Sequence, residues 1–160
     1  MITARIVRRR RVGRLSIAGG PDKVKVGFPA GEADSDVINR AVWNEFGTRG
    51  GASGGGWGGP IPERPFMRNA MRDGRGELES VIKAAAKAII REVATGGNGP
   101  AAKRRGLAKL GIKAQGMIQS EITSLSSPPN SPVTIALKGS SNPLIDSGEM
   151  RQAVSFKIED

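Results

Sequence analysis

A chain of 160 residues is long enough for one domain with a buried core and too short for two ordinary domains. It has no cysteine, histidine or tyrosine, which excludes disulfide bonds, thiolate metal sites, cysteine nucleophiles and histidine bases. The formal net charge of +10, from 25 Lys and Arg against 15 Asp and Glu, indicates either a solvated basic surface or a negatively charged partner.

Targeting signals and membrane spans are not indicated by the sequence. The N-terminus is basic, but no apolar segment of signal-peptide length follows it. No uninterrupted apolar run is long enough to cross a bilayer, so we expect a soluble protein that makes no membrane contact.

The first 28 residues have the period-two pattern of β-strands. Apolar and polar residues alternate over 14–17 and again over 23–28, with Gly-Gly-Pro-Asp between the two runs. Glycine, proline and aspartate are typical of tight turns. The pattern predicts a β-hairpin over residues 12–28.

A helix and a glycine-rich loop are expected next. Asp34, Ser35 or Asp36 is a suitable N-cap for a helix over 35–46, and Gly47 is a suitable terminator. Residues 48–60 contain seven glycines and predict an extended loop.

The middle of the chain predicts long helices. Residues 64–94 have apolar side chains at helical spacing and carry one or two helices, which end at the Thr-Gly-Gly-Asn-Gly-Pro stretch 95–100. Residues 101–125 predict a further helix, interrupted by Gly106, Gly111 and Gly116. Small residues on a helix allow another backbone to approach closely, or they are tolerated imperfections; we favour the second explanation.

The C-terminal part predicts short elements. Ser131, Pro132 and Gly139 give a cap, a first-turn proline and a terminator for a short helix, with a β-strand as the alternative because Val-Thr-Ile-Ala-Leu is β-prone. Residues 153–159 alternate and predict a strand that joins the N-terminal hairpin. We therefore expect one α+β domain over 1–160, a small antiparallel sheet covered by two long helices. A basic segment at 1–14 and the loop at 48–60 extend from it.

Catalytic motifs are not found. The glycine-rich run lacks the lysine and hydroxyl residues that end a phosphate loop, and Ser147 beside Asp146 has no histidine to complete a triad. Acidic residues are scattered singly, without metal-site spacing. We expect no enzyme activity, cofactor or metal.

The arginines near the N-terminus form the densest cationic cluster in the sequence. Arg5, Arg8–Arg11 and Arg14 have no acidic residue among the first 21 positions. Such a cluster binds phosphates by charge, but no aromatic side chain is interleaved for base stacking. A non-sequence-specific DNA-binding domain that uses this cluster is therefore an alternative function.

Three segments resemble one protein family. Ala-Val-Trp-Asn-Glu-Phe-Gly-Thr-Arg-Gly at 41–50 resembles the helix-ending Glu-Phe-Gly-Thr signature of the tail-completion, or neck, proteins of tailed bacteriophages. Ile-Pro-Glu-Arg-Pro-Phe at 61–66 is similar to the family's Ile-Pro-x-Arg-Pro-Phe element. Residues 128–159 resemble its C-terminal Leu-Ile-Asp-Thr-Gly element, with Ser147 in place of the threonine. The first 14 residues are outside the resemblance.

The resemblance implies a structural virion protein, made in the host cytoplasm and found in the neck. Family members form rings, commonly hexameric, that join the head connector to the tail around the DNA channel. Its expected partners are further copies of the chain, the head connector or adaptor, and tail terminator or tail tube proteins, with non-specific DNA contact in the channel.

The assembly interface is expected at the motif residues and at the glycine-rich loop. We interpret the loop as an arm that orders against a neighbour, with an ordinary surface loop as the alternative, and Trp57 as an anchor for a neighbour's pocket. Arg64 is expected either to pair with an acid such as Glu45, in its own subunit or in the next, or to face solvent. The interface residues are Glu45, Phe46, Gly47, Trp57, Pro62, Arg64, Pro65, Phe66 and Asp146.

Individual side chains carry further expectations. Phe66 and Trp43 are expected to pack within the subunit, and Asp146 to shape a turn or cap a helix at 147–152. Arg8, Arg9, Arg10 and Arg11 cannot all face one side of a strand. We favour an acidic protein neighbour over DNA as their partner.

Overall fold

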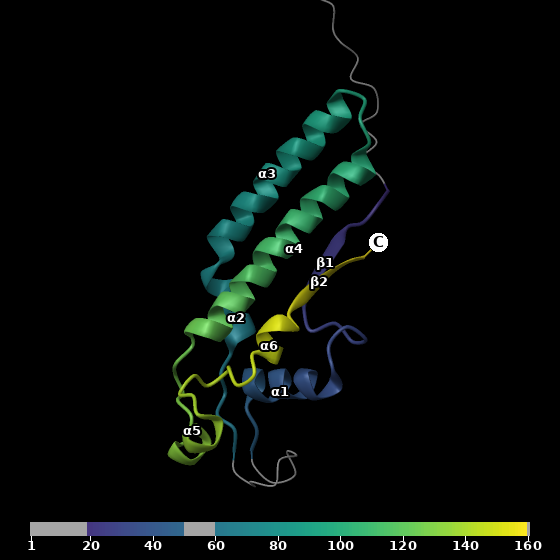
Figure 1. Cartoon of the computed structure of the whole chain (residues 1–160). Helices are drawn as coiled ribbons and strands as arrows, with labels where there is room; N and C mark the ends of the chain where they lie inside the picture. Colours follow the sequence, from purple (N-terminus) through teal and green to yellow (C-terminus); the bar gives the residue numbers. More distant parts are fainter. Residues whose placement is uncertain (1–18, 50–59, 160) are drawn as a thin grey trace, which may run out of the picture.

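The computed structural model describes residues 19–49 and 60–159, and within them the chain is a mixed α+β domain (Figure 1). The helices are α1 (Ser35–Phe46), α2 (Phe66–Asp73), α3 (Arg75–Ala94), α4 (Gly99–Ser124), α5 (Pro132–Lys138) and α6 (Glu149–Gln152). The strands are β1 (Lys23–Gly27) and β2 (Ser155–Glu159). The α+β class predicted from the sequence is confirmed.

The sheet joins the two ends of the described chain. β1 and β2 pair antiparallel, with Val24 opposite Ile158 and Val26 opposite Phe156. The prediction that the C-terminal strand pairs with the N-terminal region is therefore confirmed. The first arm of the predicted hairpin, residues 12–18, lies outside the described residues, in which the sheet has two strands.

Helix α4 lies at the centre of the packing. It contacts α3 along one side and both strands and α2 along others, as Figure 1 shows. The prediction that two long helices cover the sheet is wrong, because α4 covers the strands and α3 packs along α4. The reason is that α4 buries small or apolar residues on more than one side, whereas no residue of α3 is buried.

The core lies where α1, α2, α6 and the C-terminal half of α4 meet. Phe66, Ile118, Ile122 and Val154 are its fully buried side chains. The rings of Phe28 and Phe66 meet edge to face, with 6.2 Å between their centroids. The expected packing of Phe66 within the subunit is confirmed.

Local signals set several helix ends. The Asp34 carboxylate accepts a hydrogen bond from the Asp36 amide, and Ser131 Oγ accepts one from the Thr134 amide at 3.1 Å. Gly139 ends α5 in the left-handed conformation. The short helix is therefore confirmed over the competing strand. Residues 66–94 form two helices, which are separated at Gly74.

The glycines of α4 have different surroundings. A Cβ on Gly111 would overlap the ring of Phe156 on β2, and one on Gly106 would lie 3.0 Å from Ala85 Cβ on α3. Around Gly116 no atom lies within 4 Å of such a Cβ. The view that all three are tolerated imperfections is wrong for Gly106 and Gly111, because β2 and α3 approach α4 at these two positions.

Two matched substitutions test this difference. We expect Gly111→Ala to lower the free energy of unfolding by about 1 to 3 kcal/mol, because the methyl group overpacks against Phe156. Gly116→Ala should raise it by about 0.5 to 1 kcal/mol through helix propensity alone. Urea unfolding measures both, and equal effects at the two positions would contradict the close approach at Gly111.

Candidate functional site

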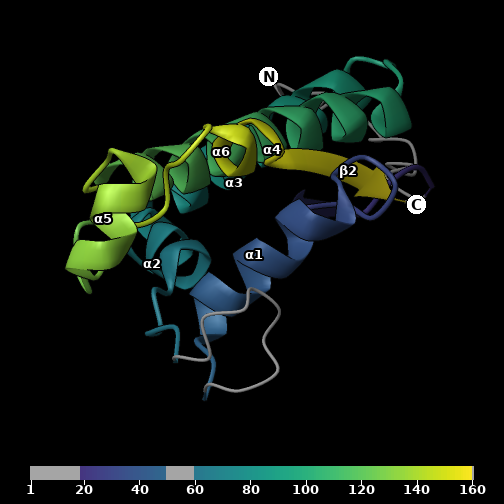
Figure 2. The same ribbon diagram turned by 60° about the horizontal axis from the view of Figure 1, so that its bottom comes forward.

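The two ends of the glycine-rich segment are tied together at its base. The Thr48 amide donates to the Ile61 carbonyl at 2.9 Å, and the Ile61 amide donates to Thr48 Oγ1 at 3.0 Å. Residues 50–59 of the predicted loop lie outside the described residues. We call residues 44–48, 61–68 and 128–130 the loop base. Figure 2 shows the neighbouring helices α1, α2 and α5 at this end of the molecule.

Gly47 allows the chain segments on either side of the glycine-rich segment to lie close to each other. Its φ of 68° is in the left-handed region, and a Cβ there would lie 3.0 Å from both the Glu63 amide nitrogen and the Ile61 carbonyl oxygen. A side chain at this position would therefore push the returning chain away. Gly47 acts both as the C-cap of α1 and as the contact point for residues 61–63.

Arg64 is buried in the middle of the loop base. Only 5% of the residue is exposed, and burial lowers the pKa of its guanidinium. The guanidinium donates to the Pro128 carbonyl at 2.9 Å, to Asn44 Oδ1 at 3.0 Å, to the Pro129 carbonyl at 3.1 Å and to Asn130 Oδ1 at 3.3 Å. Arg64 does not face solvent and does not pair with Glu45 of its own subunit, so these two expectations are wrong. Pairing with an acid of a neighbouring subunit stays a prediction.

Glu45 binds the start of α2 instead. Its carboxylate is 4% exposed and accepts from the Met67 amide at 2.8 Å and from the Arg68 amide at 3.2 Å. Helix α2 has Pro65 at its own N-cap position, with no side-chain cap, so Glu45 of α1 supplies the missing acceptor. Sequence reasoning missed this role because the cap comes from another helix.

Arg68 covers Glu45 on the solvent side. Its Nε donates to Glu45 Oε1 at 2.9 Å, and its guanidinium also pairs with Glu63. Hydrogen bonds to Glu45 and then Glu63 raise the pKa of Arg68. The same guanidinium lies 5.3 Å from the centroid of the Phe46 ring, which is 65% exposed.

A wide groove runs beside the loop base. It has a volume of about 930 Å³ and lies between the segment at Ile61 and Pro62 and helix α5. Val133 and Leu137 of α5 line it and are 56% and 67% exposed. Arg64 also lines it, so the buried cation joins the groove to the loop base.

The predicted interface residues fall into three groups. Glu45, Gly47, Arg64 and Phe66 are engaged within the subunit, as described above. Phe46, Pro62 and Asp146 are exposed, and Pro65 is half-buried. Trp57 and Arg8–Arg11 lie outside the described residues, so their predicted contacts stay predictions.

For Asp146 and Trp43 the structure excludes one of the alternatives expected. Asp146 lies in a bend, as the turn alternative predicts, but α6 has Gly148 at its N-cap and no side-chain cap, because the helix starts at Glu149. Trp43 is half-buried and lies outside the core cluster, beside a shallow hollow lined by Asp36, Asn39 and Arg40. It faces this hollow because the core side of α1 is taken by Val37 and Ala41.

An ion pair connects α1 to the C-terminal motif. Arg40 Nη2 lies 2.7 Å from Glu149 Oε2. Hydrogen bonds from Arg40 and then from Ser147 lower the pKa of the Glu149 carboxyl group. Ser147, which replaces the threonine of the family motif, therefore keeps a role for its hydroxyl group.

Searches for a metal site and for a membrane-spanning helix among the described residues, and for similar proteins, were negative. In residues 19–49 and 60–159, no group of three or more acidic side chains is placed to hold a metal ion. No helix in that part of the chain is long and apolar enough to cross a membrane. Comparison with protein-family models, curated proteins and solved structures gives no match.

The central role of Arg64 is testable by a conservative change. We expect Arg64→Lys to lower the free energy of unfolding by about 2 to 3 kcal/mol, because a lysine keeps the charge but its single ammonium group cannot reach the acceptors that surround the different edges of the guanidinium. Arg72→Lys is the matched control, since Arg72 is exposed and pairs with its neighbour Asp73. If both variants unfold at the wild-type urea midpoint, Arg64 does not hold the loop base.

Proposed function

We propose that the chain is a structural protein of the phage neck, which forms a homo-oligomeric ring between the head connector and the tail. The observation that carries the proposal is that the three segments resembling the neck family meet at Arg64. Asn44 belongs to the first segment, Arg64 to the second and Pro128–Asn130 to the third. Motif residues that are far apart in the sequence thus form one structural unit, as expected when a motif set describes one fold.

The loop base suits a ring subunit in physical terms. The buried bonds of Arg64 and Glu45 fix where the glycine-rich segment leaves and re-enters the subunit. We propose that the segment between these fixed ends, with its Trp57, contacts a neighbouring subunit. The groove beside α5, with exposed Val133 and Leu137, offers apolar surface of the kind that protein partners cover. The proposed role is structural and non-enzymatic.

Two measurements test the proposal. Mass spectrometry of virions purified from the phage or prophage that encodes the chain should detect the protein as a stoichiometric component. Native mass spectrometry of the chain together with its connector should detect a closed ring. Absence of the protein from purified virions would overturn the proposal, whatever the free subunit does in solution.

Trp57 provides a prediction for assembly. We expect Trp57→Ala to weaken ring formation while the melting temperature of the free subunit stays within about 1 °C of wild type, because no core contact is lost. Trp43→Ala is the matched control: Trp43 is a half-buried residue of α1, and its loss should lower the melting temperature. A large fall in melting temperature for Trp57→Ala would show that Trp57 packs within its own subunit.

A further inference from the structure

The distal part of the α3–α4 hairpin is strongly cationic. Residues 81–113 contain eight Lys or Arg side chains and a single carboxylate, Glu92. This stretch extends along the hairpin beyond the core (Figure 1). The eight cations are Lys83, Lys87, Arg91, Lys103, Arg104, Arg105, Lys109 and Lys113.

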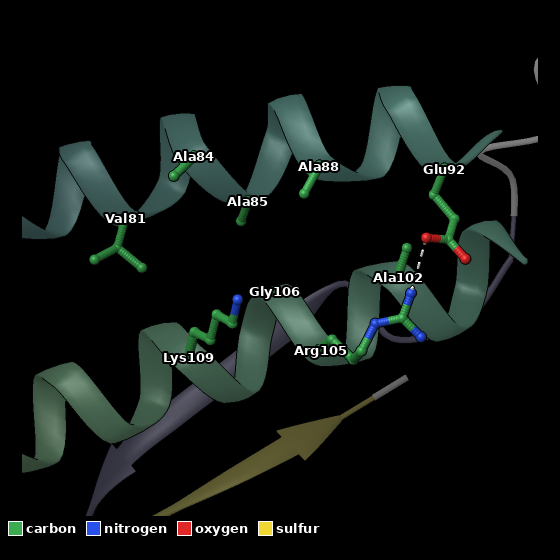
Figure 3. Close-up of a pocket in the computed structure, with 9 residues that line it drawn as sticks. All are labelled: Val81, Ala84, Ala85, Ala88, Glu92, Ala102, Arg105, Gly106 and Lys109. Atoms are coloured by element: carbon green, nitrogen blue, oxygen red, sulfur yellow. Dashed lines mark ion pairs between the residues drawn. The ribbon is translucent and has the colours of Figure 1, made fainter. Parts of the chain in front are cut away.

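The hairpin has two unlike faces. On one face a groove of about 350 Å³ lies between the helices, with Ala84, Ala88 and Gly106 along it and Arg105 and Lys109 at its edge (Figure 3). The other face has a smaller hollow that is mostly apolar, lined by side chains that include Ile82, Ile89 and Leu107. Lys103 and Asp22 also line this second hollow, whereas Arg105 and Lys109 line the first groove.

The spacing of Lys and Arg residues places their side chains in rows along α3 and α4. Arg105, Lys109 and Lys113 recur at every fourth residue of α4, so they form one row with about 6 Å between successive side chains. On α3, Lys87 and Arg91 lie three residues after Ala84 and Ala88, which places them on the same side. We call Lys87, Arg91, Arg105, Lys109 and Lys113 the cationic face.

Only part of this charge is neutralised within the subunit. Arg105 pairs with Glu92 at 3.2 Å, and Lys113 pairs with Glu77. Both ion pairs are substantially exposed and therefore weak in water. In the part of the chain that the structure describes, no carboxylate pairs with the exposed Lys87, Arg91 or Lys109.

We propose that the cationic face binds the phosphate backbone of nucleic acid without reading its bases. Two rows of cations match a partner that repeats its negative charge along its length. Residues 75–124 contain no aromatic side chain, so base stacking has no platform there. The apolar lining of the groove is four alanines, Gly106 and Val81, so it offers an acidic protein none of the aromatic anchors that protein interfaces favour.

This inference does not depend on the proposed function. The surface lies on α3 and α4 and shares no residue with the loop base. In a neck ring, the nucleic acid would be the DNA of the channel; in any other setting, the same face would bind duplex or single strands by charge alone.

Salt-dependent binding to a duplex of about 20 base pairs tests the inference. Fluorescence anisotropy from about 50 to 200 mM salt gives the slope of log affinity against log salt, which is about −0.9 for each phosphate contact. We expect the double variant Arg91→Gln with Lys109→Gln to reduce this slope by about 1.8 and to weaken binding at every salt concentration.

Matched variants separate the cationic face from net charge. Lys23→Gln with Lys157→Gln removes the same charge from exposed positions on the sheet and should leave the slope unchanged. Arg91→Lys with Lys109→Arg keeps the charge and should bind as wild type does. Circular dichroism and thermal melting confirm that each variant is folded.

Four results would overturn the inference. The first two are that the wild-type chain shows no measurable binding, or that the hairpin variant (Arg91→Gln with Lys109→Gln) keeps the wild-type slope. The other two are that the sheet variant (Lys23→Gln with Lys157→Gln) loses as much affinity as the hairpin variant, or that polyglutamate of matched charge binds in preference to duplex DNA. An additional variant, Arg9→Glu with Arg10→Glu, identifies binding that comes from the N-terminal cluster. If it removes all binding while the hairpin variant removes none, the cationic face is not the site.

Discussion

The buried guanidinium of Arg64 is the interaction on which the rest of this end of the molecule depends. A buried charge is costly unless it is well hydrogen-bonded, and here Arg64, at 5% exposure, donates to four acceptors. These acceptors belong to α1 and to the turn before α5. Loss of some of these acceptors would leave the buried charge with too few hydrogen bonds. We therefore expect the three segments to keep or lose their positions cooperatively.

Glu45 extends this constraint into the core. Its carboxylate caps α2, which starts without a cap of its own, and so fixes the direction in which α2 leaves the loop base. That direction places Phe66 and Ala70 against Ile118 and Ile122 of α4. The loop base and the core are therefore one cooperative unit, whereas the distal α3–α4 hairpin, with no buried residue on α3, extends beyond it. Assembly and nucleic-acid binding are thus proposed for opposite ends of the molecule.

What the sequence predicts well is local. Asp34 before α1, the Ser131-Pro132 start of α5 and the alternation of β2 each act within a few residues, and the elements form as expected. Arg64 was not predictable because its acceptors are two backbone carbonyls and the side-chain oxygens of two distant asparagines, which leave no pattern in the sequence. Glu45 and Gly111 depend on partners that only the tertiary fold brings near, namely the start of α2 and the ring of Phe156.

Amide hydrogen exchange in the free subunit tests most directly whether the loop base is part of the folded core. The amides of Thr48, Arg64 and Met67 are hydrogen-bonded to the Ile61 carbonyl, the Asn44 carbonyl and the Glu45 carboxylate. Our account predicts that they exchange as slowly as the amides of Ile118 and Ile122, through the same global opening. Exchange of these three amides at the rate of an unstructured peptide, while α4 remains protected, would contradict it.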